Sequence, residues 1–321
     1  MIDRMTALLS NRKILFLISA LWMSTAALDA RAADTLTWTG CGITKKAFMK
    51  ELAAAFKKKT GIDVQLSGGG ASKGIRFAAS ALADVGGACR HRLFVNEQVV
   101  GTELRTRLYQ VAWDALVVIT HKDNPVDTIT VDQLKQVYNG HIKNWAALHG
   151  PDKPIRLATR KGKYSGVGQM FRSLVFHYQE YDFLASSKQF PSSGPLEKYV
   201  AATPYSLAMD GISSARKRPV KVLALDGVRP TKANIANGTY PLFRPLYLVT
   251  NSRPSAPVKK LIAFALSKEG QRIISEQGTV NLEEGRALFP LWREKAKRYG
   301  IFAENNNDDF KASGVTALDL R

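Results

Sequence analysis

Residues 35–90 read TLTWTGCGITKKAFMKELAAAFKKKTGIDVQLSGGGASKGIRFAASALADVGGACR, and this stretch decides the fold. Short strand patterns alternate in it with amphipathic helix patterns, of which the first is ended by Gly61. The expected elements are a strand at 36–39, a helix at 45–59, a strand at 62–66, a helix from Ser72 and a strand at 83–86. This alternation predicts a βαβαβ unit, and therefore an α/β protein with a parallel sheet. Ligands of such sheets bind at the carboxyl ends of the strands, where the strand order reverses.

The rest of the chain continues the alternation. Thr130 and Gln133 have the spacing of a capping box, which predicts a helix start. The other expected elements are long strands at 111–120 and 241–250, strands at 155–158 and 220–225, and helices from Ser165, Pro195, Ala256 and Glu269.

Three turns rich in Gly, Ser and Thr each leave a strand and open a helix. They are residues 39–44, 68–74 and 160–168. The first N–H groups of a helix are unpaired and lie at the positive end of its dipole, so such turns attract anions. Arg90 and Arg160 lie beside two of these turns. Together they predict a site for a small oxyanion.

The first 32 residues have the form of a secretory signal peptide. Basic residues precede a mostly apolar stretch at 14–28, and Ala30-Arg31-Ala32 is a small-x-small cleavage site. A membrane anchor is the alternative, but the apolar stretch is shorter than the roughly 20 residues that span a bilayer. We therefore expect cleavage after Ala32 and export to a bacterial periplasm.

Composition and motifs exclude several classes of function. The net charge of +19 invites a nucleic-acid interpretation, but no zinc-finger spacing, aromatic RNA-binding signature or sustained basic helix is present. The basic residues form a solvated surface or attract anionic ligands. There is no Gly-x-Ser-x-Gly elbow, His-Glu-x-x-His helix or Walker loop. We therefore expect neither an enzyme nor a nucleic-acid partner, and no cofactor or metal.

Three segments carry a resemblance to a known family. They are Asp84-Val-Gly-Gly-Ala-Cys-Arg90, then Asp123-Asn-Pro-Val126 with the downstream Gln133–Gly140 and Asn144-Trp145, and the loop from Arg160 to Phe171. In their order they resemble the substrate-binding proteins of bacterial phosphate ABC importers, which are two-lobed periplasmic binding proteins of type II. The resemblance runs from about Thr35 to about Arg293.

The resemblance implies two α/β lobes with a ligand cleft between them. Lobe one comprises residues 33–114 and 242–321, lobe two comprises residues 115–241, and the two long strands cross between them. A monomer that captures a small oxyanion and delivers it to a membrane ABC permease is the function that the family implies.

Site residues follow from the same resemblance. Thr44 supplies a hydroxyl and an N–H group, Ser72 a hydroxyl and Arg160 a guanidinium fork, while Ser165 and Gly166 form an anion nest. Arg90 either contacts the ligand or pins its own loop. These ligand-binding positions are Thr44, Ser72, Arg90, Arg160, Ser165 and Gly166.

The chain departs from the family pattern at two places. Four residues, instead of three, separate Arg160 from Ser165, and Val167 stands where the family has a threonine. Cys89 takes a position at which some phosphate binders have an aspartate. The ligand is therefore an oxyanion, either phosphate or a related ion.

Cys41 and Cys89 are the two cysteines of the chain. The family's strand order would place both at the carboxyl ends of adjacent strands, so a disulfide between them is expected in an oxidising compartment. The alternatives are free thiols that line the pocket, and a thiol site for a soft metal or arsenite with His91 as a third donor. The second alternative would make the protein a periplasmic sensor or thiol-based binder that signals to a membrane partner. A thiol nucleophile formed by Cys89 and His91 is a further alternative.

Overall fold

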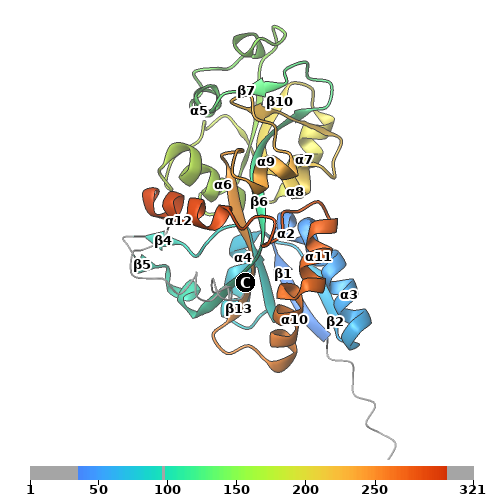
Figure 1. Ribbon diagram of the computed structural model, residues 1–321. Helices are drawn as coiled ribbons and strands as arrows, with labels where there is room; N and C mark the ends of the chain where they lie inside the picture. The colour runs from blue at the N-terminus through green and yellow to red at the C-terminus, as the bar shows by residue number, and fades with distance from the viewer. Residues whose placement is uncertain (1–34, 96–97, 302–321) are drawn as a thin grey trace, which may run out of the picture. The chain divides into compact units, whose positions relative to one another are not determined.

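The computed structural model describes residues 35–95 and 98–301 (Figure 1). The expected signal peptide and the polar tail from residue 304 lie outside these residues. Within the described residues, nine strands form one sheet in the order β2-β1-β3-β13-β6-β10-β8-β9, with β11 paired to β6. Their bounds are β1 Thr35–Gly40, β2 Asp63–Ser67, β3 Val85–Ala88, β6 Thr106–His121, β8 Arg156–Arg160, β9 Lys188–Phe190, β10 Ser206–Gly211, β11 Val220–Val222 and β13 Phe243–Asn251.

The predicted βαβαβ unit is confirmed. Strand β1 pairs in parallel with β2 and with β3, and Trp38 of β1 lies opposite Leu66 and Val85. The first helical segment begins as α2 (Gly42–Thr44), passes through a π turn at Lys45–Met49 and continues as α3 (Lys50–Thr60). The second helix is α4 (Ala71–Ala79). Parallel pairing sends the loops after β1, β2 and β3 to one edge of the sheet, where the site lies.

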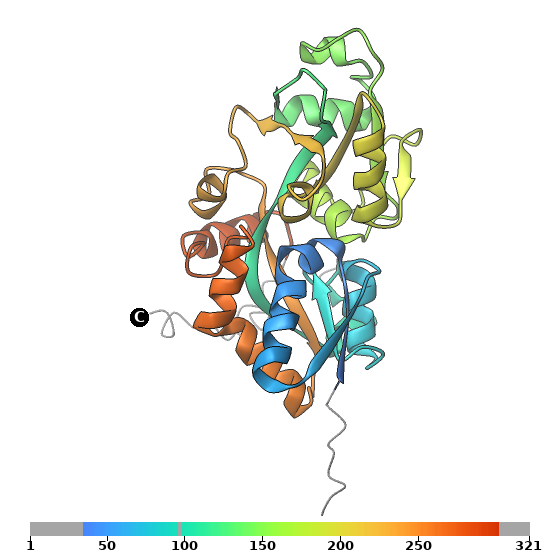
Figure 2. The same cartoon turned by 90° about the vertical axis from the view of Figure 1, so that its right-hand side faces the viewer.

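Strand β6 is shared by both halves of the sheet. Its first part pairs antiparallel with β13, and its last part pairs antiparallel with β10. Figure 2 shows this strand running from the elements around β1 and β3 to those around β10. Most of its 16 residues are buried, which explains the long apolar run in the sequence. The predicted long strands at 111–120 and 241–250 are confirmed as β6 and β13.

Helices cover both halves of the sheet. The capping box at Thr130 is present: its hydroxyl accepts from the Gln133 N–H group, and the Gln133 side chain accepts from the Thr130 N–H group. The remaining helices of eight or more residues are α5 Val131–Asn139, α7 Ser193–Ala202, α10 Ala256–Leu266, α11 Lys268–Glu276 and α12 Leu288–Arg298. A helix from Ser165 was predicted, and the structure places α6 (Gly166–Phe171) and a π turn there.

Gly74 allows helix α4 to lie directly on the sheet. A Cβ atom at this position would come within 2.8 Å of the carbonyl oxygens of Thr39 and Gly87. A glycine therefore brings the first turn of α4 close to the ends of β1 and β3. This close packing positions the loop at residues 68–71 beside the loop that follows β1.

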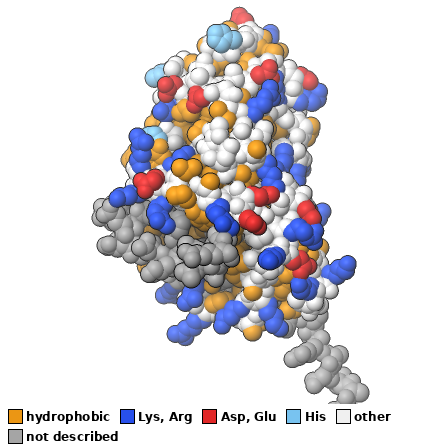
Figure 3. All heavy atoms as spheres, viewed as in Figure 1, with side chains coloured by type: hydrophobic (Ala, Val, Ile, Leu, Met, Phe, Trp, Pro, Cys, Tyr) orange, Lys and Arg blue, Asp and Glu red, His pale blue; other side chains and the backbone are white. Residues whose placement is uncertain are grey.

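The surface charge fits the solvated-surface interpretation. Figure 3 shows Lys and Arg side chains spread over the visible face among polar and apolar atoms. In the basic run at 57–59, Lys57 pairs with Asp63 and Lys59 pairs with Glu269. Such exposed pairs contribute about 0–1 kcal/mol each.

Candidate anion-binding site

The three predicted turns meet around one small chamber. Its volume is about 10 Å³. The first turn contributes Cys41, Gly42 and Ile43, the second contributes Gly70 and Ala71, and the third contributes Gly166 and Val167; Cys89, Arg160, Ser192 and Ser193 complete the lining. A larger pocket of about 250 Å³ shares Gly70, Ala71 and Arg160 with the chamber. The ends of strands from both halves of the sheet thus supply one site.

Each turn brings a helix start to the site. Helix α4 has Gly70 as its N-cap, with φ of 89°, and no side chain caps its first turn. Ser165 caps α6 by accepting from the Gly168 N–H group at 3.2 Å. Cys41 caps α2, and its Sγ accepts from the Thr44 N–H group at 3.4 Å. The glycine cap leaves the N–H groups at the start of α4 without a competing side chain.

Arg160 is held at the end of β8 by neutral groups. Its Nη1 donates to Ser193 Oγ at 2.9 Å and its Nη2 donates to the Pro191 carbonyl at 3.0 Å. Its buried Nε has no hydrogen-bond partner among the described residues. Burial lowers the pKa of Arg160, and the nearby Asp210 opposes that shift. A buried guanidinium with an unused donor at the chamber wall is suited to a tetrahedral oxyanion.

Arg90 is held by partners inside the protein. Its guanidinium forms a two-point ion pair with Glu103, at 2.8 and 3.0 Å, and both side chains are fully buried. The remaining donors reach the carbonyls of His91 and Tyr164 and the hydroxyl of Ser72. Arg90 lines neither cavity. Of its two predicted roles, the structure therefore supports the pinning of a loop.

The hydroxyls of Thr44 and Ser72 also have partners inside the protein. Thr44 is fully buried, donates to the Cys41 carbonyl at 3.0 Å and lines neither cavity. Ser72 lines the larger pocket, but its hydroxyl donates to the Tyr164 carbonyl at 2.6 Å and accepts from Arg90. The Thr44 hydroxyl thus already has an acceptor inside the protein, and the Ser72 hydroxyl links the second and third turns. Ser165 lines the larger pocket and Gly166 lines the chamber, as a ligand role would require.

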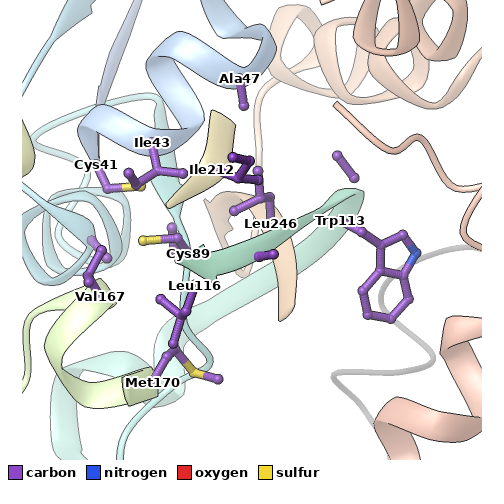
Figure 4. Packing of buried hydrophobic residues seen from close by; sticks show 14 of the residues in the cluster. Cys41, Ile43, Ala47, Cys89, Trp113, Leu116, Val167, Met170, Ile212 and Leu246 are labelled. Atoms are coloured by element: carbon purple, nitrogen blue, oxygen red, sulfur yellow. The ribbon is translucent and has the colours of Figure 1, made fainter. Parts of the chain in front are cut away.

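Cys41 and Cys89 are free thiols, which corrects the expected disulfide. Figure 4 shows both side chains beside Ile43 and Val167. Both cysteines line the chamber, and Cys41 Sγ is held by the Thr44 N–H and hydroxyl groups. The pKa of Cys41 is lowered to about 7 against the effect of burial, by its hydrogen bonds to Cys89 and Thr44 and by the charge of Arg244. The pKa of Cys89 is raised by that same hydrogen bond and by burial.

His91 does not join the two thiols. Its Nδ1 lies 2.8 Å from the hydroxyl of Tyr247, and its ring stacks on Trp292. Among the described residues, no cluster of three or more His, Cys, Asp or Glu side chains could hold a metal ion. The contacts of His91 with Tyr247 and Trp292 therefore give no support to the two alternatives in which it joins Cys89, as a third donor or in a thiol nucleophile.

Two buried clusters beside the site were missed in the sequence. Arg244 of β13 pairs with Asp114 of β6 at 2.9 Å and also donates to the carbonyls of Cys89 and Gly166. It thus holds the two walls of the chamber together. A charged residue within each of the two long apolar strands was the available signal, because lone buried charges require partners.

The second cluster lies behind Arg160. Buried Glu197 receives hydrogen bonds from Ser214, from Lys46 at 2.5 Å and from Arg218 at 2.6 Å. Burial raises the pKa of Asp210 well above its ordinary value, and the charge of Glu197 adds to this shift. Neither Asp210 oxygen has a hydrogen-bond partner within the described part of the chain, although Ser193 and Glu197 lie near. A neutral Asp210 leaves the charge of Arg160 available for an anion.

Comparison with known proteins places this architecture in a family. The profile of a PBP superfamily domain matches residues 25–269. The chain belongs to the PBP superfamily. Two relatives are phosphate-binding proteins PstS. That of Borreliella burgdorferi is 29% identical over 180 residues, which cover 54% of this chain and 64% of the relative. That of Bacillus subtilis is 25% identical over 254 residues, with 78% and 82% covered.

Solved structures in the PBP superfamily show the same arrangement. A phosphate ABC transporter substrate-binding protein from Clostridium perfringens, solved with bound phosphate, has a TM-score of 0.68 at 27% identity and covers 77% of this chain and 99% of its own. An ABC-type phosphate transport receptor from Vibrio cholerae has a TM-score of 0.59 at 25% identity, with 77% and 100% covered. The predicted type II periplasmic binding protein fold is confirmed. In the part of this chain that the structure describes, no helix is long and apolar enough to cross a membrane.

Proposed function

We propose that this protein is a periplasmic substrate-binding protein that captures a phosphate-like oxyanion for a membrane ABC permease. The observation that carries the proposal is the meeting of three helix starts with Arg160 at one chamber. The PstS relatives and the phosphate-bound neighbour support phosphate as the ligand class. Binding would use N–H dipoles and one guanidinium, and no chemical step is needed.

The strand pattern supports a binding mechanism by closure. Residues 33–114 with 242–321 would form one lobe and residues 115–241 the other, joined through β6 and β13. An anion that contacts both Arg160 and the start of α4 would favour the closed arrangement by its differential affinity. Closure would then present the loaded protein to the permease, and the protein would act as a monomer without a nucleic-acid partner.

The test is calorimetry of the purified mature protein with phosphate. Arg160→Ala should weaken phosphate binding by about 1.5–3 kcal/mol, because a charge-assisted two-point contact is lost. Arg156→Ala is the matched control, since Arg156 is an exposed arginine on the same strand β8. Equal affinities for phosphate in the Arg160→Ala and Arg156→Ala proteins would remove Arg160 from the site. Absence of phosphate binding by the unmodified protein would reject phosphate as the ligand.

A further inference from the structure

Two thiols lie in the wall of the chamber that the anion would occupy. Cys41 is at the end of β1 and Cys89 follows β3, and both line the chamber together with Arg160 and Gly166. Both cysteines line one chamber of only about 10 Å³, so a single small bound atom could contact the two side chains. Oxyanion binding by N–H groups and a guanidinium does not require either thiol.

Both thiols are buried, and the start of α6 packs directly against Cys89. A Cβ atom at Gly166 would come within 2.5 Å of Cys89 Sγ and 2.9 Å of Ala71 Cβ. A glycine at this position thus leaves room in front of the sulfur for the start of α6. Gly70, Ala71 and Arg160 line both the chamber and the larger pocket, so a ligand bound by the sulfurs would lie next to Arg160.

The charges around the thiols favour a neutral or anionic ligand over a bare metal cation. Arg160 lines the chamber, and Arg244 lies behind Cys89 and donates to its carbonyl. The positive charge of Arg244 also acts on both thiols, and a group at Cys41 with a pKa of about 7 is partly thiolate at neutral pH. Soft thiolate ligands select thiophilic elements.

We propose that the Cys41–Cys89 pair is a dithiol site for a small oxyacid of a thiophilic element, of which arsenite is the probe. The inference rests on the proposed function, because it assigns a second ligand class to the same chamber. Each thiol replaces one hydroxyl of As(OH)₃: an As–S bond forms, an As–O bond breaks, and the thiol proton leaves with the hydroxyl as water. Two such exchanges release two waters, and arsenic remains As(III). The third hydroxyl then faces the larger pocket and Arg160.

The first experiment measures protection of the thiols. The mature protein is reduced with a phosphine, the phosphine is removed, and alkylation by iodoacetamide is followed by mass spectrometry with and without sodium arsenite. Arsenite should protect both cysteines, and Cys41→Ser and Cys89→Ser should each abolish protection of the remaining thiol. Unchanged alkylation of the reduced protein in excess arsenite would overturn the proposal, as would full protection in both serine variants.

A second measurement does not depend on the folding of the variants. X-ray absorption at the arsenic edge of the unmodified protein with bound arsenite should show two sulfur ligands and one oxygen. Three oxygen ligands and no sulfur would overturn the dithiol site. Arg160→Ala separates the two proposals: it should weaken phosphate binding and keep arsenite protection of the thiols, because the two As–S bonds do not involve Arg160. Arsenite protection without phosphate binding in the unmodified protein would reject the proposed phosphate function and leave the dithiol site standing.

Discussion

Two buried arginines near the site have opposite environments. The charge of Arg90 is cancelled by the two-point ion pair with Glu103, and all its neighbours are inside the protein. Arg160 is held only by a hydroxyl and a carbonyl, and its Nε has no partner among the described residues. A buried arginine is available to an anion only when no carboxylate already neutralises it. The comparison therefore indicates a structural role for Arg90 and supports the proposal that Arg160 binds the ligand.

The largest expected effect is a loss of stability when Glu103, the ion-pair partner of Arg90, is removed. Glu103→Ala should destabilise the protein by about 3–5 kcal/mol, because it leaves a buried charge without compensation. The Leu93 N–H group, which donates to Glu103 at 2.8 Å, loses its acceptor as well. Urea denaturation measures the loss. The control is Arg105→Ala, because Arg105 is exposed in the same short 3-10 helix. A Glu103→Ala protein as stable as the Arg105→Ala protein would show that Arg90 and Glu103 do not form a buried ion pair.

His91, the residue after Arg90, should make the free energy of unfolding depend on pH. Burial and the charges of Arg90 and Arg92 lower the pKa of His91 from 6.5 to about 3. Below pH 6.5 the unfolded chain binds a proton that the folded chain does not bind until about pH 3. Stability should therefore fall with falling pH across this window, by about 1.4 kcal/mol per pH unit where the difference is one full proton.

The control for this pH dependence is His91→Gln, which removes the titrating ring and keeps a polar side chain. The free energy of unfolding is measured by urea titration between pH 6.5 and 4. It should fall less steeply with falling pH in the variant, because the contribution of His91 is absent. Identical slopes in the two proteins would mean that His91 is protonated in the folded state and that the surroundings of Arg90 are less buried than the structure indicates.

The contrast between the two arginines could not be predicted from the sequence. The helix starts could be predicted from the sequence, because apolar periodicity and glycine-rich turns are local signals. The parallel pairing of β1, β2 and β3 followed from the same signals. The partner of Arg90 lies 13 residues further on, and only the packing of that 3-10 turn brings it into contact. The resemblance to a family predicted a ligand role for Arg160, but its neutral partners depend on where α7 begins.

Other elements were missed for different reasons. Strand β10 lies at the centre of its half of the sheet, yet its apolar stretch is only Leu-Ala-Met and it ends in Asp-Gly, which is typical of a turn. Helix α12 did carry a signal, because Leu288, Trp292 and Ala296 are spaced four apart and are all buried. The free state of the two thiols depends on side-chain directions, which strand order alone does not give.

Arg160→Lys tests whether Arg160 contributes its planar geometry or only its charge to phosphate binding. A lysine keeps the positive charge but replaces the planar fork by a point charge, so phosphate binding should recover only in part relative to Arg160→Ala. We expect an affinity about tenfold below that of the unmodified protein, which corresponds to about 1.4 kcal/mol. Calorimetry of the three proteins at one salt concentration measures it. Full recovery with lysine would show that Arg160 contributes only its charge.

The smallest effect should come from Ser193, which positions Arg160. Its hydroxyl accepts from Arg160 Nη1 at 2.9 Å, and Ser193 is buried at the start of α7. Ser193→Ala should weaken phosphate binding by about 0.5–1.5 kcal/mol, the usual contribution of one hydrogen bond. Lys198→Ala, an exposed position on the same helix, should have no effect. Combining Ser193→Ala with Arg160→Ala supplies the decisive measurement, because a residue that acts through Arg160 adds nothing once that side chain is gone. Additive losses of binding free energy would instead place Ser193 in direct contact with the anion. The Pro191 carbonyl would then be the group that positions Arg160.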